Sequence, residues 1–183
     1  QRYQAGGGGF LYSRYENPTV VALEEKLAAA DGAESSLAFG SGMAATATLL
    51  MALTSPGDEV VCAAAIYGGT LHILTDLLAR FGATARFVKV EDLASLSSVF
   101  GPQTKMLWFE TPSNPTLRCV DIAVVARACK AAGVTSVIDN TFASPMNQQP
   151  LARGVDLSMQ SASKYLNGHS DVTAGVVSGP AAM

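Results

Sequence analysis

The feature that most constrains this chain is the alternation of short apolar segments with segments of helical periodicity. The apolar segments cover residues 36–39, 59–63, 87–90, 105–110, 136–141, 156–160 and 172–178. Strands separated by helices are typical of an α/β fold whose sheet is mostly parallel and flanked by helices. The interior of segment 105–110 is entirely apolar, so we expect it near the centre of a seven-stranded sheet.

The helical segments carry capping signals. Asn17 followed by Pro18 predicts an N-cap and a first helical position, and Gly32 is a suitable residue to end that helix. The apolar positions of this first helix share one face: Val20, Leu23, Leu27 and Ala30. Further helices are expected over 43–53, 70–81, 121–133 and, less regularly, 92–100.

Composition and charge exclude several classes of protein. The 183 residues are 49% hydrophobic and 15% charged, which favours an ordered domain with a buried core. A net charge of −3 provides no basic surface for nucleic acid or anionic lipid. No apolar run is long enough to cross a bilayer, and residues 1–4 do not resemble a signal peptide. We therefore expect a cytoplasmic protein without nucleic-acid or membrane partners.

The cysteines support the same location. Cys62, Cys119 and Cys129 are odd in number, lie in apolar segments and lack metal-ligand spacing. They predict buried free thiols in a reducing compartment, and no metal site.

A glycine-rich turn at residues 40–45 is a candidate phosphate site. It joins an expected strand to an expected helix, so backbone N–H groups and the positive end of the helix dipole would face a ligand. The pattern Gly40-x-Gly42-x-x-Ala45 also resembles a dinucleotide fingerprint. That fingerprint requires an acid after the next strand, which instead ends in Ala63-Ala-Ala-Ile66. A ligand with a single phosphate is therefore favoured over a nicotinamide nucleotide.

Three further polar residues follow predicted strands, where open α/β sheets bind their ligands. Tyr67 precedes two glycines at a strand-to-helix junction, Asn114 lies between two prolines, and Asp139 directly follows Val137-Ile138. For Tyr67 a structural role and contact with a flat ligand both stay open. Asp139 is either a loop cap or a functional acid, because a buried carboxylate needs a partner.

Lys164 follows the sixth predicted strand among the small hydroxyl residues Ser161 and Ser163. A lysine enclosed in this way can lose solvent and acquire the lowered pKa that suits Schiff-base chemistry. A solvated surface charge is the alternative. His169, in the turn that follows, is interpreted as a structural turn residue.

The first residues of the chain differ in composition from the rest. Residues 1–11 contain four consecutive glycines, Gly6 to Gly9, and predict a mobile arm that continues through Tyr12 and Arg14. We therefore divide the chain into an arm, residues 1–19, and a domain, residues 20–183.

Six motifs in order resemble the large domain of the Cys/Met-metabolism family of pyridoxal-phosphate enzymes, which has the fold of type I transferases. They cover almost the whole chain: Tyr12-Ser-Arg14 with Asn17-Pro-Thr19, Ser41-Gly-Met43, Tyr67-Gly-Gly-Thr70, Glu110-Thr-Pro-Ser-Asn-Pro115, Asp139-Asn-Thr141, and Ser161-Ala-Ser-Lys164 with Asn167-Gly-His-Ser-Asp171. No single motif is specific, but the ordered set is typical of this family.

The resemblance implies a role for each site residue. Lys164 would bind pyridoxal 5'-phosphate covalently and move the α-proton, and Asp139 would pair with the ring nitrogen. Tyr67 would stack on the ring and assist proton transfer, while Asn114 would contact the phenolic oxygen and the substrate carboxylate. The phosphate would be bound by Gly42, Met43, Ser161 and Ser163. Tyr12 and Arg14 would complete the phosphate site of a neighbouring subunit in a homotetramer, a dimer of dimers.

The activity implied is elimination or replacement at the β or γ carbon of a sulfur amino acid or homoserine ester. Cystathionine γ-lyase or γ-synthase is favoured, with an O-acetyl- or O-succinylhomoserine sulfhydrylase as the alternative. Methionine γ-lyases typically carry cysteine where Gly69 stands, so that activity is less favoured. The family commonly has threonine where Ser163 stands, and serine keeps the hydroxyl.

Family members continue into a smaller C-terminal domain with the carboxylate-binding arginine, whereas this sequence ends at Met183. The expectation is a large domain truncated before that C-terminal domain and inactive alone. Two hypotheses from other classes are a nicotinamide-dependent oxidoreductase and an inactive fragment that acts only as a binding module.

Overall fold

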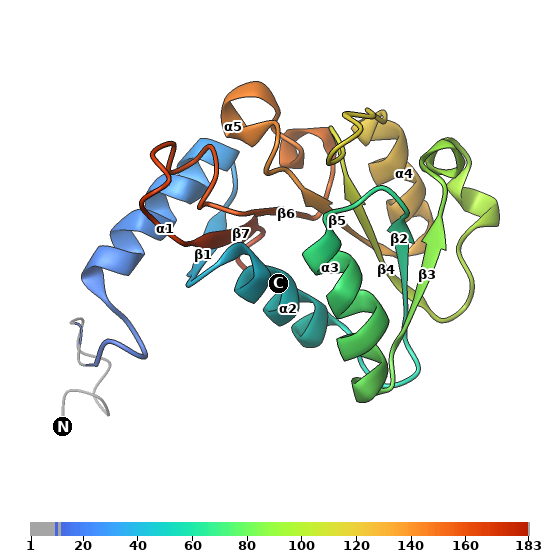
Figure 1. Ribbon diagram of the computed structural model, residues 1–183, viewed down its shortest axis with the longest axis horizontal. Helices are drawn as coiled ribbons and strands as arrows, with labels where there is room; N and C mark the ends of the chain where they lie inside the picture. Colours follow the sequence, from blue (N-terminus) through green and yellow to red (C-terminus); the bar gives the residue numbers. More distant parts are fainter. Residues whose placement is uncertain (1–9, 11, 183) are drawn as a thin grey trace.

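The computed structural model describes residues 10 and 12–182, which form five α-helices and one seven-stranded sheet. The helices are α1 (Pro18–Asp31), α2 (Gly42–Leu53), α3 (Gly68–His72), α4 (Ile122–Ala132) and α5 (Ser144–Asn147). The strands are β1 (Ser35–Phe39), β2 (Glu59–Ala63), β3 (Thr84–Val88), β4 (Thr104–Glu110), β5 (Thr135–Asp139), β6 (Leu157–Gln160) and β7 (Gly175–Gly179). Figure 1 shows their arrangement.

The sheet has the strand order β1-β7-β6-β5-β4-β2-β3, with β4 and β5 in its interior. Strands β6, β5, β4, β2 and β3 are parallel to one another, while β7 is antiparallel to both β6 and β1. The expectation of a mostly parallel α/β sheet is confirmed. Because β1 and β6 run in the same direction, the carboxyl ends of six strands meet the start of β7 at one edge of the sheet.

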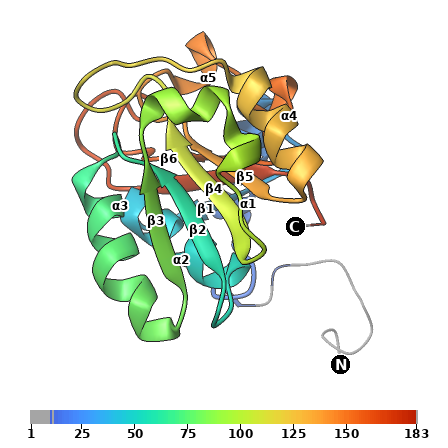
Figure 2. The same cartoon turned by 90° about the vertical axis from the view of Figure 1, so that its right-hand side faces the viewer.

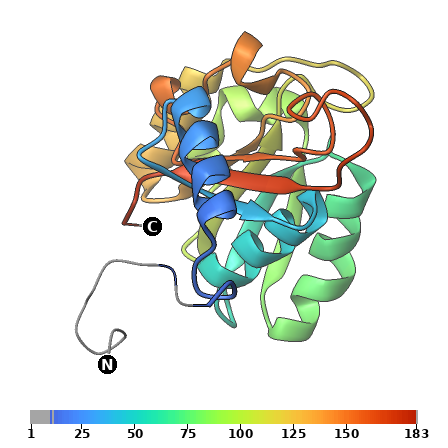
Figure 3. The same cartoon turned by 90° about the vertical axis from the view of Figure 1, so that its left-hand side faces the viewer.

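Helices cover both faces of the sheet (Figure 2). One core cluster contains residues of α2, residues 74 and 78, and strand residues such as Trp108, whereas the other contains α4 and strand residues such as Phe109. These two neighbours in β4 point to opposite faces, as the period of a strand requires. Figure 3 shows α1 lying over the part of the sheet formed by β1 and β7.

Helix ends follow the predicted capping chemistry. The Asn17 side chain accepts hydrogen bonds from the N–H groups of Thr19 and Val20, and Pro18 is the first helical residue. Gly32 and Gly133 end α1 and α4 in the left-handed conformation. Helix α1 therefore begins two residues before the boundary drawn between the predicted arm and domain. Residues 1–9 and 11, including Gly6 to Gly9, lie outside the described residues.

Several element predictions are corrected. Strand β3 begins at Thr84, three residues before the predicted Phe87, because the chain enters the strand soon after the left-handed turn at Gly82. Strand β7 begins at Gly175, and Val172 is exposed in the preceding loop. Segment 92–100 forms two short 3-10 helices, Val90–Ala94 and Leu96–Ser98. The run after α3 continues as a π-helical turn, Ile73–Leu77, and a 3-10 turn, Leu78–Phe81.

One burial prediction is also corrected, and the apolar face of α1 is partly exposed. On that face, Val20 and Leu23 are 41% and 44% exposed. Cys62 and Cys129 are buried free thiols, but Cys119 is exposed because it lies in the loop that follows Asn114 and not in an apolar element. Within the described part of the chain, none of the helices combines the length and apolar character that crossing a membrane requires.

Candidate active site

A cavity of about 690 Å³ opens at the edge where the carboxyl ends of the strands meet. Its walls come from the residues that follow β1, β2, β4, β5 and β6 and from the loop that leads into β7. The predicted site residues that line it are Gly42, Met43, Tyr67, Asn114, Asp139, Ser161, Ser163 and Lys164. The fold thus brings together eight residues that are spread over 123 positions of the sequence.

The amino end of α2 forms one wall of this cavity. Ser41 is the N-cap, and its hydroxyl oxygen accepts the N–H of Ala44 at 3.0 Å. The N–H groups of Gly42 and Met43 belong to the first turn, where no acceptor exists within the helix. A Cβ atom on Gly42 would lie 2.7 Å from Cβ and 2.9 Å from Oγ of Ser161. Glycine therefore allows the helix end and the Ser161 hydroxyl to meet, and together they favour an anion.

Ser163 and Lys164 follow Ser161 along the same segment. The Ser163 hydroxyl donates to the carbonyl oxygen of Ala174 at 3.1 Å and accepts the N–H of Ala174 at 2.9 Å. The hydroxyl proton of Ser163 is therefore already used in the hydrogen bond to Ala174, just before β7. Ser161 is the better donor to an anion. Lys164 is exposed at the cavity, so the desolvation expected from its sequence surroundings is not found in this chain.

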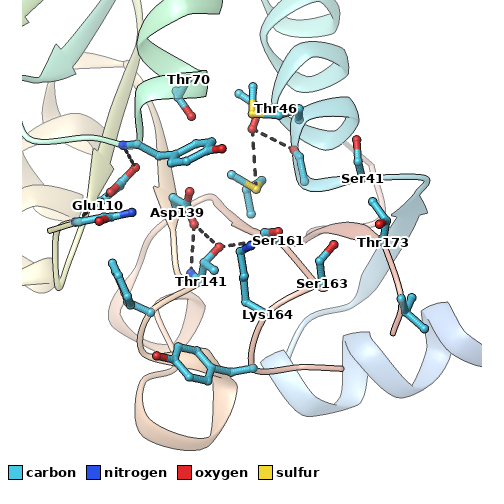
Figure 4. A pocket seen from close by; sticks show the side chains of 18 of the residues that line it. Ser41, Thr46, Thr70, Glu110, Asp139, Thr141, Ser161, Ser163, Lys164 and Thr173 are labelled. Carbon is cyan, nitrogen blue, oxygen red and sulfur yellow. Dashed lines mark hydrogen bonds between the residues drawn. The ribbon is translucent and has the colours of Figure 1, made fainter. Parts of the chain in front are cut away.

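Asp139 ends β5 and is 9% exposed. Its Oδ1 atom accepts the N–H of Thr141 at 3.0 Å and the hydroxyl of Thr141 at 2.5 Å, and Thr141 in turn accepts the N–H of Ser161 at 2.8 Å. Burial raises the pKa of Asp139, and the two bonds from Thr141 lower it in part. Figure 4 shows Thr141, Ser161 and Lys164 gathered beside this carboxyl group.

Glu110 is a site residue that the sequence analysis did not single out. It ends β4 and is the register partner of Asp139 on the neighbouring strand. Its Oε1 accepts the N–H of Tyr67 at 2.5 Å, and its Oε2 accepts the N–H of Asn114 at 3.3 Å. Burial, followed by the negative charge of Asp139, raises the pKa of Glu110 to about 7 against the pull of the two N–H donors. Its place at the end of the apolar interior strand β4 was the available signal.

Tyr67 is the N-cap residue of α3 and is 48% exposed. A Cβ atom on Gly69 would lie 2.6 Å from Cε1 of Tyr67 and 2.7 Å from Sδ of Met43. The ring and the Met43 thioether thus occupy the space that a side chain at Gly69 would need. Because Tyr67 also lines the cavity, its ring is a candidate contact for a flat ligand.

Tyr12 and Arg14 do not line the cavity. The Arg14 guanidinium lies 5.4 Å from the ring centre of Tyr12 and 4.9 Å from that of Tyr15. His169 also lies outside the cavity wall, where its Nδ1 bonds the carbonyl oxygen of Asn167 at 2.9 Å. Among residues 10 and 12–182, His, Cys, Asp and Glu side chains form no group of three that could hold a metal ion.

Fold and site together define an α/β domain in which the amino end of a helix, a buried acid and a lysine surround one cavity. The sequence matches the family model described as Cys/Met metabolism PLP-dependent enzyme over residues 1–182. The chain belongs to this family, whose cofactor is pyridoxal phosphate. The dinucleotide interpretation of Gly40 to Ala45 is therefore set aside.

Relatives with different names match almost equally well. The chain is 46% identical to the cystathionine gamma-lyase of Mus musculus, covering 97% of this chain and 45% of that protein. It is 43% identical to the L-methionine gamma-lyase of Pseudomonas putida, covering 96% and 44%. It is 44% identical to the chloroplastic cystathionine gamma-synthase 1 of Nicotiana tabacum, covering 93% and 32%. The crystal structure of metB from Corynebacterium glutamicum superposes with a TM-score of 0.91 at 40% identity, covering 94% of this chain and 45% of that one.

The chain thus spans less than half the length of these relatives. Within that span, the residues present fit the cofactor of the family. The helix end at Gly42 with Ser161 suits its phosphate, the buried Asp139 suits a ring nitrogen that carries a proton, and Lys164 supplies an amine at the same cavity.

Proposed function

We propose that the protein containing this chain catalyses elimination or replacement at the β or γ carbon of a sulfur amino acid or homoserine ester. The activity favoured is that of a cystathionine γ-lyase or γ-synthase. One observation carries the proposal: Lys164, the buried Asp139 and the amino end of α2 at Gly42 line a single cavity.

The residues that line the cavity have different roles toward the cofactor. The cofactor, when bound, supplies an electron sink for the negative charge that develops at the substrate α-carbon. Lys164 would hold the cofactor through its amine and would move the α-proton of the substrate. Asp139, oriented by Thr141, keeps a proton on the ring nitrogen through its negative charge.

Further residues would hold the two ends of the cofactor. The N–H groups of Gly42 and Met43 and the hydroxyl of Ser161 bind the phosphate, with Ser163 fixing the loop through Ala174. Tyr67 covers one ring face and assists proton transfer, and Asn114 binds the phenolic oxygen and the substrate carboxylate.

The proposal extends to the assembly and its location. The large domain would comprise residues 20–183, and residues 1–19 would form an arm toward a neighbouring subunit. Tyr12 and Arg14, absent from the cavity of their own chain, would complete the phosphate site of that neighbour in a homotetramer. The free thiols Cys62 and Cys129 support a reducing, cytoplasmic location.

Product analysis on the protein at the full length of its relatives tests the activity. Release of cysteine, ammonia and a keto acid from cystathionine indicates the lyase. Formation of cystathionine from an O-acylhomoserine and cysteine indicates the synthase. Formation of homocysteine from an O-acylhomoserine and sulfide indicates the sulfhydrylase. Lys164→Ala should abolish product, whereas Lys105→Ala, an exposed lysine at the start of β4, should not. Equal turnover in the Lys164→Ala variant would contradict the proposal.

A further inference from the structure

Glu110 connects two segments that are distant in the sequence. Its two carboxylate oxygens each accept one main-chain N–H, from Tyr67 at 2.5 Å and from Asn114 at 3.3 Å. Tyr67 lies between β2 and α3, and Asn114 lies in the loop that follows β4. Because each oxygen accepts an N–H from a different loop, this one side chain ties both loops to the end of β4.

The position of Glu110 is an unfavourable one for a purely structural acid. It is 5% exposed and is the register partner of Asp139, which is also buried. Two carboxyl groups on neighbouring strands repel each other when both are ionised, and burial disfavours each charge. Figure 4 shows Glu110 and Asp139 at the same side of the cavity.

A carboxylate nevertheless offers something that a neutral isostere cannot. Both of its oxygens accept hydrogen bonds, whereas the glutamine amide has one acceptor and one donor group. Only the carboxylate can therefore offer a separate acceptor oxygen to each of the N–H groups of Tyr67 and Asn114.

We propose that Glu110 is a positioning residue. Its carboxylate fixes the main chain at Tyr67 and Asn114, so that both side chains are oriented toward the cofactor. This inference rests on the proposed function, which makes Tyr67 and Asn114 the contacts to the ring face and to the phenolic oxygen. Glu110 itself acts through these two residues.

The test compares Glu110→Gln and Glu110→Ala with a matched control. Asp156→Ala is suitable, because the Asp156 carboxylate accepts the N–H of Ser136 at 2.8 Å and its hydroxyl at 2.6 Å at the opposite edge of the sheet. Three quantities are measured: amide hydrogen exchange at residues 67 and 114, the dissociation constant of pyridoxal phosphate, and the visible absorbance band of the bound cofactor. Thermal unfolding of the cofactor-free proteins reports whether each variant folds.

The expected result separates the variants. Glu110→Ala should accelerate exchange at both amides about tenfold or more, and Glu110→Gln at one or both. Both variants should weaken pyridoxal phosphate binding by roughly tenfold and shift the visible band, in line with the loss of about one charged hydrogen bond. Asp156→Ala should lower the melting temperature while leaving exchange at residues 67 and 114, the dissociation constant and the band as in the parent.

Three outcomes would overturn the inference. Parent-like exchange at both amides in Glu110→Ala would refute the tie between the loops. Faster exchange with parent affinity and an unshifted band would refute the role toward the cofactor. If the parent itself shows no band, the proposed function fails, and faster exchange in the variants would then mark Glu110 as a structural residue alone. Glu110→Gln, which preserves side-chain volume, decides the matter if Glu110→Ala does not fold.

Discussion

Thr141 and Ser161 are joined by a hydrogen bond from the Ser161 N–H to the Thr141 hydroxyl oxygen, at 2.8 Å. The same hydroxyl donates to Asp139 at 2.5 Å. One side chain thus connects the acid at the end of β5 with the segment that carries the candidate phosphate contact and the candidate lysine. A substitution of Thr141 should therefore change both the orientation of Asp139 and the position of Ser161.

Thr141→Val should lower the free energy of unfolding by about 1–3 kcal/mol, because it leaves the Ser161 N–H without its acceptor. It should also raise the pKa of Asp139 further, since it removes the hydroxyl bond, one of the two bonds from residue 141 that lower this pKa. Pyridoxal phosphate binding should weaken as well. Urea unfolding and a cofactor titration measure these effects, and Thr141→Ser, which keeps the hydroxyl, should stay close to the parent. Parent-like binding in Thr141→Val would show that the link is dispensable for the site.

Gly42→Ala should weaken cofactor binding by tenfold or more, because its Cβ would lie 2.7 Å from Cβ of Ser161. Either the helix end or Ser161 must then move, and both are candidate phosphate contacts. Gly40→Ala is the control, since no atom lies within 4 Å of a Cβ at that position. The double variant Gly42→Ala with Ser161→Gly removes the two shortest contacts and leaves Cα of residue 161 at 3.0 Å, without restoring the hydroxyl, so it should recover stability more than affinity. Equal affinity in Gly42→Ala and Gly40→Ala would argue against this anion site.

The stability of the cofactor-free chain should fall as the pH rises from about 4.5 to about 7. Folding raises the pKa of Glu110 from 4.5 to about 7, so the native state binds more protons than the unfolded chain within this window. Such a shift corresponds to roughly 3 kcal/mol of stability lost once the pH exceeds the folded pKa. Burial also raises the pKa values of Asp139 and Asp31, which act in the same direction.

Comparison with Glu110→Gln isolates the share of Glu110 in this pH dependence. Urea unfolding at pH 5, 6, 7 and 8 should give a shallower decline in the variant than in the parent, whatever its absolute stability. Identical slopes would mean that Glu110 does not titrate in this range. The cofactor must be absent from these measurements, because a cation bound near Asp139 would lower the pKa of both acids.

Mixing two defective proteins tests the proposed contribution of the arm. In the Arg14→Ala protein, each phosphate site lacks the arginine of the neighbouring subunit, so the cofactor should bind weakly. In the Lys164→Ala protein, each site lacks the covalent attachment point. A mixed assembly of full-length proteins contains some sites with an intact Lys164 from one subunit and an intact Arg14 from the other. The visible band at low cofactor concentration should therefore be stronger in the mixture than in either protein alone. A mixture no better than the average of its components would place Arg14 outside the neighbouring site.

The sequence was sufficient for those features that depend on local chemistry. The start of α1 followed from Asn17 and Pro18, and the positions of Asp139 and Lys164 followed from the rule that ligands gather at the carboxyl ends of parallel strands. These predictions needed only strand boundaries, which the apolar runs supplied.

Features that depend on contacts between distant segments could not be predicted in the same way. The N–H that Glu110 accepts from Tyr67 comes from 43 positions away, and the bond between Ser163 and Ala174 appears only once β7 is paired antiparallel to β6. The exposure of Cys119 depended on where its loop lies and not on its apolar neighbours. The shift of β3 shows the limit for an edge strand, which pairs on one side only.

The most direct measurement is peptide mapping after borohydride reduction of the protein incubated with pyridoxal phosphate. The proposed function predicts one dominant modified peptide, with the cofactor attached to Lys164 and with no label on Lys105 or Lys130. Modification spread over several exposed lysines, with Lys164 labelled no more than the others, would contradict the assignment of this cavity as the cofactor site.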